Sequence, residues 1–473
     1  MVDGRALTAQ FEDAADFETR KVLCGGQLLT VLFLDGLTSG GDIAEQVVRP
    51  LAQMTDEARE EVLYTRALQG GVWCASVKEP ESTQQAAELL VNGFCVILFP
   101  GSGKALGCEV KTGEKRSPSP PETENTVKGA KDAFTETLRT NTSLVRRHLR
   151  TPGLRLAETV IGKRTLTKVT VCWIDRLTDP ELPRRMQERL SSIDIDGALS
   201  PAAIEEYVTG SRRTAFPLLE YTERTDHFCQ GLLDGQVGLL TDGLPLGYLA
   251  PVGLGRLMRS PEDRATDFFS ASMLRLLRYA ALGVSLLLPA LYAAMAMFHQ
   301  QMLPTKLLLS IIESKQNVPF STLLEVLGLL CAFELLQQAG LHLPQAVGTA
   351  VSIIGGLVVG TAAVDAKLVS PAALIVTASS GICGFTLPNR ELSDAVRLWR
   401  FVLTVLAGLW GLFGVTVGLL LLLTELAGLE SLGRSYLSPF GRAEVKGALV
   451  RPRLVRQKWR DGALKPMDDQ NQR

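Results

Sequence analysis

Two long stretches without a charged residue constrain this chain more than any other feature. Residues 279–298 carry no Asp, Glu, Lys or Arg over 20 positions, and residues 401–424 carry none over 24 positions. An α-helix rises about 1.5 Å per residue, so 20 residues span about 30 Å, the thickness of the hydrocarbon core of a bilayer. The sequence therefore predicts an integral membrane protein, and the residues before about 273 are expected to form a domain attached to the membrane part.

The average composition hides a sharp division of the chain. Its 473 residues are 46% hydrophobic and 21% charged, with a net charge of −1, but residues 1–270 are mixed and residues 272–431 are nearly all apolar. A net charge near zero argues against a nucleic-acid partner, because phosphate binding needs a concentrated basic surface. The polar amino terminus lacks the basic and apolar regions of a signal peptide, so we expect the part before residue 279 to stay in the cytoplasm.

The soluble half contains two pairs of similar segments. In the first pair, each member is a β-branched or aromatic run followed by an Asp. In the second pair, each member is an Asn-Gly or Asp-Gly dipeptide followed by a predicted strand. The pairs are 29–38 with 169–178 and 90–98 with 232–240. The second member of each pair follows the first at nearly the same distance along the chain, so both pairs shift together. We interpret residues 22–112 and 165–255 as two copies of one α/β subdomain.

The remaining segments complete the predicted domain organisation. Residues 1–21 are a polar amino-terminal segment, and residues 113–164 are a loop followed by a helical linker, with an apolar stripe that predicts a helix over about 121–150. Residues 256–431 are the transmembrane domain, and residues 432–473 are a basic cytoplasmic tail. The predicted fold class is a multi-pass α-helical membrane domain preceded by a cytoplasmic α/β region built of two similar subdomains.

Five apolar stretches offer possible membrane crossings. They are 279–298, 320–338, 346–364, 369–388 and 401–424. Arginines and lysines flank both the first and the last stretch, which predicts that both ends face the cytoplasm and that the number of crossings is even. We interpret 320–338 as a re-entrant or interfacial segment, because it contains two acids and has prolines nearby. The arginines at 390, 397 and 400 fit this count poorly, because they would then face outward.

Three acids fall at membrane depth, where ionisable groups are costly and usually functional. They are Glu325, Glu334 and Asp365, and Lys367 lies beside the last. Glu325 and Glu334 are nine residues apart, so they point to opposite sides of a continuous helix. Two interpretations remain open: the acids line an ion pathway, or they lie paired at the membrane interface.

Small residues recur at steps of one to four residues in the third stretch. They are Gly348, Ser352, Gly355, Gly356 and Gly360. Small side chains allow helices to approach closely, which is the simplest reason for the pattern. The alternative is a narrow apolar constriction formed by several chains, which gates ions by dewetting.

The sequence offers no complete site for catalysis, a metal or a cofactor. The eight cysteines and four histidines are scattered and form no zinc or disulfide pattern. The Gly101-Ser-Gly-Lys104 segment lacks the first glycine and the final Ser or Thr of a phosphate-binding loop. The acids at Asp194 and Asp196 lack the bidentate Glu that a calcium loop needs. We therefore expect no enzyme activity, no cofactor and no metal site.

Several short motifs resemble the A subunit of the GerA-type spore germinant receptors. The likeness covers about residue 25 to Pro439, nearly the whole chain. In the soluble half the motifs are Pro121-Glu122, Phe134-Thr-Glu136, Thr140-Asn141, Leu144-Val-Arg-Arg147, Ser192-Ile-Asp-Ile-Asp-Gly197, Leu232-Leu-Asp-Gly235 and Ser260-Pro-Glu-Asp263. In the membrane half they are Leu274-Arg-Leu-Leu-Arg278, Leu288-Pro-Ala-Leu-Tyr292, Phe298-His-Gln300, Pro304-Thr305, Leu307-Leu-Leu-Ser-Ile311, Ala350-Val-Ser-Ile-Ile-Gly355 and Val369-Ser-Pro371.

The resemblance implies a multi-pass protein in the inner membrane of the spore of a spore-forming bacterium. It implies work with a transporter-like B subunit and a C-subunit lipoprotein, and oligomerisation into a cation channel that opens when a nutrient binds. A SpoVA-associated paralogue that amplifies germination belongs to the same family, so that role stays open. A secondary transporter with a solute site at the midplane is a further alternative, although the spans contain no inverted repeat that would support it.

Overall fold

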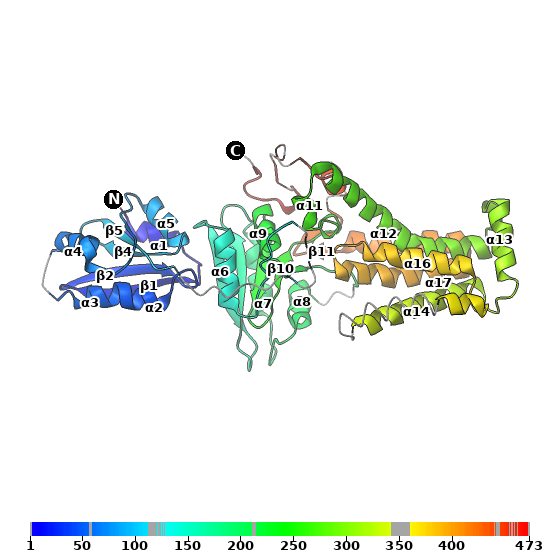
Figure 1. Ribbon diagram of the computed structural model, residues 1–473, viewed down its shortest axis with the longest axis horizontal. Coiled ribbons are helices and arrows are strands. Elements are labelled where there is room, and N and C mark those ends of the chain that lie inside the picture. Colours follow the sequence, from blue (N-terminus) through cyan, green and yellow to red (C-terminus); the bar gives the residue numbers. More distant parts are fainter. Residues whose placement is uncertain are drawn as a thin grey trace.

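The computed structural model shows an elongated molecule with two α/β units followed by a helical bundle (Figure 1). The first α/β unit lies at one end, the second lies in the middle, and the bundle forms the other end. The described residues are 2–55, 59–111, 121, 124, 126, 128–210, 214–341, 360–438, 440, 445–453, 455, 457, 459–460 and 462–471.

The first subdomain is built on a five-stranded antiparallel sheet with the order β1-β2-β4-β5-β3. Strand β4 is buried along its whole length, because helices cover both faces of the sheet. The strands are β1 (Phe17–Cys24), β2 (Gln27–Leu34), β3 (Val77–Lys78), β4 (Phe94–Phe99) and β5 (Lys104–Glu109). The helices are α1 (Gly4–Ala9), α2 (Gly40–Asp42), η1 (Ile43–Val48), α3 (Arg49–Gln53), α4 (Glu60–Arg66), η2 (Ala67–Gly71) and α5 (Thr83–Val91).

The second subdomain repeats this arrangement, with the strand order β6-β7-β9-β10-β8. Helices α7 and α8 pack on one face of its sheet, and α6 and α9 pack on the other. The strands are β6 (Leu154–Ile161), β7 (Thr167–Ile174), β8 (Glu220–Thr222), β9 (Val237–Thr241) and β10 (Gly247–Ala250). The helices are α6 (Leu138–His148), α7 (Glu181–Ser191), α8 (Pro201–Thr209) and α9 (Thr225–Asp234).

The segments that matched in the sequence occupy equivalent places in the two sheets. The first pair contributes the second strand of each sheet, β2 and β7, and the second pair contributes the central strands β4 and β9. The glycines Gly93 and Gly235 both have positive φ and both follow the helix before the central strand, a conformation that favours glycine at a helix end. The predicted fold class, an α/β region with two similar sheets before a helical membrane part, is confirmed.

Two details of the predicted soluble half differ from the structure. The helix expected over 121–150 is only α6, Leu138–His148, and the described residues from 128 to 137 form turns and extended chain. The segment 1–21 is not merely polar: it contains α1, with buried Leu7, and the first residues of β1. Both differences arise because local patterns do not reveal where long-range packing stops a helix or recruits a strand.

A buried ion pair joins the two α/β subdomains. The Nε and Nη2 groups of Arg146 in α6 each donate to a different carboxylate oxygen of Asp16, at 2.8 Å, and its Nη1 donates to the Leu154 carbonyl at 3.1 Å. Both side chains are at most 2% exposed. Beside the pair, Ala14 forms a parallel bridge with Leu156 at the edge of β6. The amino-terminal segment is thereby fixed to the second subdomain.

Three helices of the described chain are long and apolar enough to cross a membrane. They are Phe268–Met297, Thr322–Gly340 and Arg390–Gly428, and the shorter apolar helix Pro371–Phe385 lies with them. The helices of this half are α10 (Leu254–Leu257), α11 (Glu262–Ala265), α12 (Phe268–Met297), η3 (Gln300–Met302), α13 (Thr305–Lys315), α14 (Thr322–Leu341), α16 (Pro371–Phe385) and α17 (Arg390–Gly428). Figure 1 shows α12, α14, α16 and α17 side by side, with α13 at the far end.

The longest helix, α17, is a helical hairpin. Gly411 has φ 61° and ψ −142°, which reverses the chain between a first arm, residues 390–410, and a second arm, residues 412–428. A Cβ on Gly414 would overlap the carbonyl oxygen of Leu406, so the arms are in backbone contact next to the turn. The second arm returns to the soluble region, where Thr214 Oγ1 donates to Glu425 Oε1 at 2.7 Å.

Two apolar stretches differ from the interpretation of the sequence. The stretch 401–424, predicted to cross once, contains the reversal at its centre, because a glycine turn removes no apolar character from the run. The stretch 320–338, interpreted as a re-entrant or interfacial segment, is helical from Thr322 onwards as part of α14, and this helix is long enough to cross a membrane. The arginines at 390, 397 and 400 lie on the first arm, which starts beside the soluble region, so they no longer conflict with the orientation of the ends.

Charged side chains connect the second subdomain to the start of the bundle. Arg256 in α10 donates to Glu220 Oε2 at 2.7 Å and to Asp234 Oδ2 at 3.0 Å, and His227 Nε2 lies 2.9 Å from Glu220 Oε1. In the next step along the chain, Asp263 pairs with two arginines at the start of α12, Arg275 and Arg278. We call Glu220, His227, Asp234 and Arg256 the neck network. Burial alone would raise the pKa of Glu220, but the charges of Arg256 and His227 lower this pKa to about 2.

The neck network predicts a pH dependence of stability. Because the folded-state pKa of Glu220 lies below its ordinary value of 4.5, its contribution is present above that value and is lost as the pH falls through about 2. We expect Glu220→Gln to lower the free energy of unfolding by about 3 kcal/mol at pH 7, since it leaves a buried arginine short of its partner. Unfolding curves of the full chain in detergent should show this difference shrinking between pH 4.5 and 2. The exposed control Glu206→Gln should change little; a pH-independent effect of Glu220→Gln would contradict the assignment.

The carboxy-terminal tail packs on the second subdomain. Arg434 pairs with Asp179, Arg460 Nε donates to the Leu233 carbonyl at 3.0 Å, and the Met467 amide donates to the Leu177 carbonyl at 2.9 Å. The described parts of the tail include β11 (Glu430–Ser431), β12 (Arg434–Ser435), α18 (Val445–Leu449) and η5 (Gly462–Leu464). The tail also contacts the bundle, because Arg275 Nη1 in α12 donates to the Gly447 carbonyl at 3.2 Å, and the Val252 amide donates to Ser431 Oγ, just after α17, at 3.0 Å.

Candidate functional site

Glu325 lies in a buried ion pair at the far end of the bundle. Its side chain is fully buried, its Oε1 accepts a hydrogen bond from the Ser370 amide, and its Oε2 lies 3.4 Å from Lys315 Nζ. Lys315 ends α13, and Ser370 caps α16 by accepting from the Ala373 amide at 3.3 Å. Glu325 thus links α13, α14 and α16, which fits a paired acid better than one that lines an open pathway.

Glu334 lies near the other end of α14, against the first arm of α17. Its Oε1 accepts a hydrogen bond from Arg397 Nη1 at 2.8 Å. The same arginine also binds Gln337 and Asp394. Glu325 and Glu334 therefore have different neighbours, and the structure does not bring the two acids together.

The remaining predicted site residues have a different status. Asp365 and Lys367 are exposed. Gly360 is buried, and a Cβ there would lie 3.5 Å from Leu374 Cδ2 in α16, which is ordinary contact. Gly348, Ser352, Gly355 and Gly356 lie outside the described residues. Their proposed place in a pore therefore stays a prediction.

Helix α14 runs antiparallel to the first arm of α17 in a defined register. Glu334 contacts Arg397, and a Cβ on Gly408 would overlap the side chain of Leu323. Leu323 precedes Glu334 by the same number of positions as Gly408 follows Arg397. Equal spacing in opposite directions means that the residues of the first arm between these contacts have facing positions on α14. Arg400 faces position 331, three residues before Glu334.

Arg400 is a buried cation that the sequence analysis did not single out. Its side chain is 1% exposed, and its Nη1 donates to Ser380 Oγ of α16 at 3.1 Å. The Ser380 hydroxyl in turn donates to the Ser285 carbonyl of α12 at 2.7 Å. Among the described residues, Arg400 Nε and Nη2 have no hydrogen-bond partner. Its poor fit to the predicted topology was the signal in the sequence.

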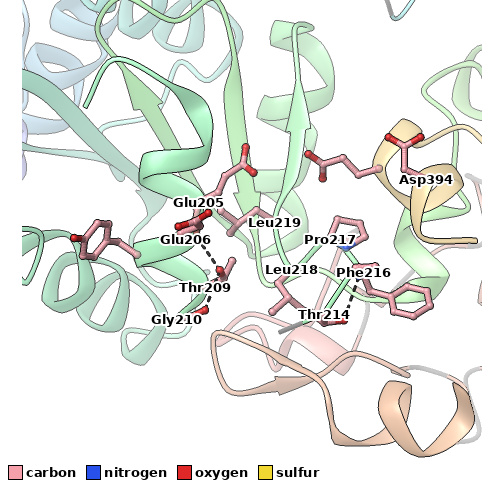
Figure 2. Close-up of a pocket in the computed structure, with 13 residues that line it drawn as sticks. Glu205, Glu206, Thr209, Gly210, Thr214, Phe216, Pro217, Leu218, Leu219 and Asp394 are labelled. Atoms are coloured by element: carbon pink, nitrogen blue, oxygen red, sulfur yellow. Dashed lines mark hydrogen bonds between the residues drawn. The ribbon is translucent and has the colours of Figure 1, made fainter. Parts of the chain in front are cut away.

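A pocket of about 930 Å³ lies between the second subdomain and α17 (Figure 2). Figure 2 shows carboxylates on two sides of it, with Glu205 and Glu206 from α8 and Asp394 from α17. Burial raises the pKa of Glu205. The other wall is the segment 214–219, and its Thr214 binds the second arm of α17. The pocket therefore marks a joint at which the soluble region touches both arms of the hairpin.

In the described part of the chain, no three His, Cys, Asp or Glu side chains gather as metal ligands would. The polar groups of the bundle are instead distributed in pairs and triads between helices. The geometry does not bring together a nucleophile and a base among the residues named above.

Comparison with known proteins gives the family. The family described as Bacillus/Clostridium GerA spore germination protein matches residues 5–466. The chain belongs to the GerA spore germination protein family. Spore germination protein KA of Bacillus subtilis is 34% identical over 448 residues, which cover 93% of this chain and 81% of that protein. The uncharacterized membrane protein YfkQ of the same species is 36% identical over 450 residues, covering 94% of this chain and 87% of that protein.

A solved structure is also similar to this GerA family member. It is the N-terminal domain of the A subunit of the Bacillus megaterium spore germinant receptor GerK3, at 23% identity and a TM-score of 0.41, covering 52% of this chain and 92% of that chain. Family membership and the three apolar helices together assign this chain to the membrane proteins of spore germination.

Proposed function

We propose that this chain is the A subunit of a nutrient germinant receptor and that several copies form a cation channel in the inner membrane of the spore. Membership of the GerA family and relatives named as spore germination proteins support the proposal. The transporter-like B subunit and the C-subunit lipoprotein are the proposed partners, and the chain itself has no catalytic role in this scheme.

The observation that carries the proposal is the joint between the soluble region and α17. Both arms of the hairpin contact the segment 214–219 or line the same pocket, and the neck network ties α10 to the second subdomain. A displacement of the soluble region is therefore transmitted to both arms of α17 at once. This is the mechanical connection that a ligand-controlled channel needs.

The proposed ion pathway uses the small residues that follow α14. They are Gly348, Ser352, Gly355, Gly356 and Gly360. The acids Glu325, Glu334 and Asp365 flank this segment in the sequence and are the proposed charged groups of the pathway. A narrow apolar pore conducts only when it is wetted, so side-chain size at these positions sets the barrier to ions. Gly360 is buried beside Leu374 of α16, so a larger side chain there would also press on that helix.

The test uses spores that carry single substitutions at the small residues. We expect Gly348→Leu, Ser352→Leu or Gly360→Leu to change the rate of nutrient-triggered potassium release by about tenfold, equal to about 1.4 kcal/mol in the barrier. The matched control is Gly328→Leu in α14, where a Cβ meets no atom within 4 Å. Normal release from all three variants would show that these residues do not line the pore.

A second measurement separates the channel from other roles. Purified chain in liposomes, with and without the B and C subunits, should pass monovalent cations only in the oligomer. A spore that lacks this chain and responds more slowly to every nutrient, while keeping each response, would indicate the amplifying role instead. Saturable, counter-ion-coupled uptake of a solute would indicate a secondary transporter.

A further inference from the structure

The Nε and Nη2 groups form one edge of the Arg400 guanidinium. In two other buried arginines of this chain, the Nε and Nη2 groups together hold an aspartate. Arg146 holds Asp16 at 2.8 Å from each nitrogen, and Arg224 holds Asp226 at 3.0 and 2.7 Å. In Arg400 the same two nitrogens have no partner among the described residues, although the side chain is 1% exposed.

An arginine in this position calls for a carboxylate. Arg400 lies ten residues into the first arm, about halfway along it, where an unpaired charge in an apolar bundle is strongly unfavourable. The Nε–Nη2 edge is a fixed pair of donors that matches the two oxygens of a carboxylate. Ser380 satisfies only Nη1 and brings no negative charge.

Glu334 is the carboxylate that can reach it. Its contact with Arg397 places it within about one helical turn of Arg400 along α17, and its Oε2 is buried without a hydrogen-bond partner among the described residues. Only its Oε1 is engaged, by Arg397 Nη1. Arg397 and Arg400 are three residues apart, one helical turn, so they face α14 at neighbouring levels.

We propose that Arg400 is a carboxylate-binding site whose occupant is Glu334, and that α14 exchanges between two registers against α17. In the register of this structure Glu334 pairs with Arg397. In the other register α14 lies three residues further towards the tip of the hairpin, about 4.5 Å away, and Glu334 pairs with Arg400.

The packing of α14 allows such a movement. In its most apolar window 17% of residues are buried, against 44% for α12 and 39% for α17. Phe333 and Leu323 pack directly on Gly381 and Gly408, where an added Cβ would overlap them, so these two contacts hold α14 in the observed register and must break in the exchange.

The two registers give the acids of α14 different partners. Moving to Arg400 releases Glu325 from the Ser370 amide at the far end of the helix. It also moves the end of α14, Leu341, which directly precedes the segment that carries the proposed pore residues. The exchange goes beyond the proposed channel, because it assigns a two-position element that exists whether or not ions pass.

Disulfide cross-linking measures the register directly. Thr404 follows Arg397 by seven residues and so faces position 327 in the observed register, while position 330 faces it after a three-residue shift. In full-length protein in membranes, with Cys331 and Cys383 replaced by alanine, Thr404→Cys is combined with Leu327→Cys or with Leu330→Cys. The two cross-linked yields, from oxidation with copper phenanthroline and peptide mass spectrometry, report the two registers.

Substitution of either arginine should move the ratio of these yields in opposite directions. We expect Arg397→Gln to raise the 330–404 yield relative to 327–404 by about tenfold or more, and Arg400→Gln to suppress it, because each removes one partner of Glu334. Glu334→Gln should abolish the response to both. Arg390→Gln, an exposed arginine at the start of the same helix, is the matched control.

Each outcome decides the proposal. An unchanged ratio in Arg397→Gln, equal to that of Arg390→Gln, overturns it. A bromide-dependent gain in the unfolding temperature that Arg400→Gln removes, with no change of ratio, would assign the site to a small dissolved anion and also overturn it. Normal potassium release from all three pore variants, with an intact register exchange, would count against the proposed channel and leave this inference standing.

Discussion

Replacing Asp16 with alanine is expected to lower the free energy of unfolding by about 3–5 kcal/mol, because it leaves the Arg146 guanidinium buried without a counter-charge. Both side chains are almost fully excluded from solvent, and the pair is bidentate. The measurement is thermal or denaturant unfolding of the full chain in detergent. The exposed control Glu18→Ala in β1 should change stability by less than about 0.5 kcal/mol.

The pair also tests whether the charges themselves are needed. In the double variant Asp16→Leu/Arg146→Met the buried charge is absent, so we expect most of the lost stability to return. Because the pair joins the two subdomains, Asp16→Ala should in addition separate their unfolding transitions. If Asp16→Ala and the double variant unfold alike, the contact contributes only packing and the ion pair is not what couples the subdomains.

Short repeated patterns were the part of the fold that the sequence revealed well. The paired segments, which recur at nearly the same distance along the chain, lie in equivalent strands, because an apolar run followed by a turn dipeptide fixes a buried strand locally. The contact between Asp16 and Arg146 has no such signature. The two residues are 130 positions apart, and nothing near either of them indicates its partner.

The membrane half shows where an apolar pattern stops being informative. The charge-free run 279–298 predicts a long apolar helix, and residues 279–297 lie in α12. Residues 401–424 have the same character, yet Gly411 reverses the chain within them. Glycine is frequent in straight membrane helices, so the sequence alone does not distinguish a packing glycine from a turn glycine. The distinction comes from tertiary contact between the two arms.

The sequence likewise showed residues of the candidate site without showing their partners. Glu325 and Glu334 were visible as acids in an apolar context, but their partners are Lys315, Ser370 and Arg397, which lie on three other segments. Arg400 was missed as a site residue because it directly precedes the charge-free run and is buried only by helices far away in the sequence. The sequence shows which charged residues fall in or next to apolar stretches, but only the packed bundle shows which residues they bind.

Replacing Gly414 with valine is expected to disrupt the hairpin and to destabilise the protein by about 3 kcal/mol or more, at the upper end of what overpacking usually causes. Its Cβ would overlap the carbonyl oxygen of Leu406, a backbone atom that can yield only if the two arms separate. At Gly411 a side chain would meet His299 Cε1 at 2.8 Å in a backbone conformation that favours glycine. Gly283→Val in α12, where a Cβ meets no atom within 4 Å, controls for the lower helix propensity of valine.

The hairpin also fixes which positions share a face of the membrane. Its two arms, residues 390–410 and 412–428, are about 31 and 26 Å long, and the exposed aromatic side chains Trp410 and Phe413 lie at the tip, as at a membrane interface. Single cysteines at Asn389 and Gly428 should therefore react with an impermeant maleimide from the same side, and a cysteine at Trp410 should not. In Gly414→Val this pattern should be lost together with the sharp unfolding transition. Labelling of Asn389 and Gly428 from opposite sides in the parent protein would mean that α17 crosses once, because a helix that does not turn back at Gly411 separates its two ends by the full thickness of the bilayer.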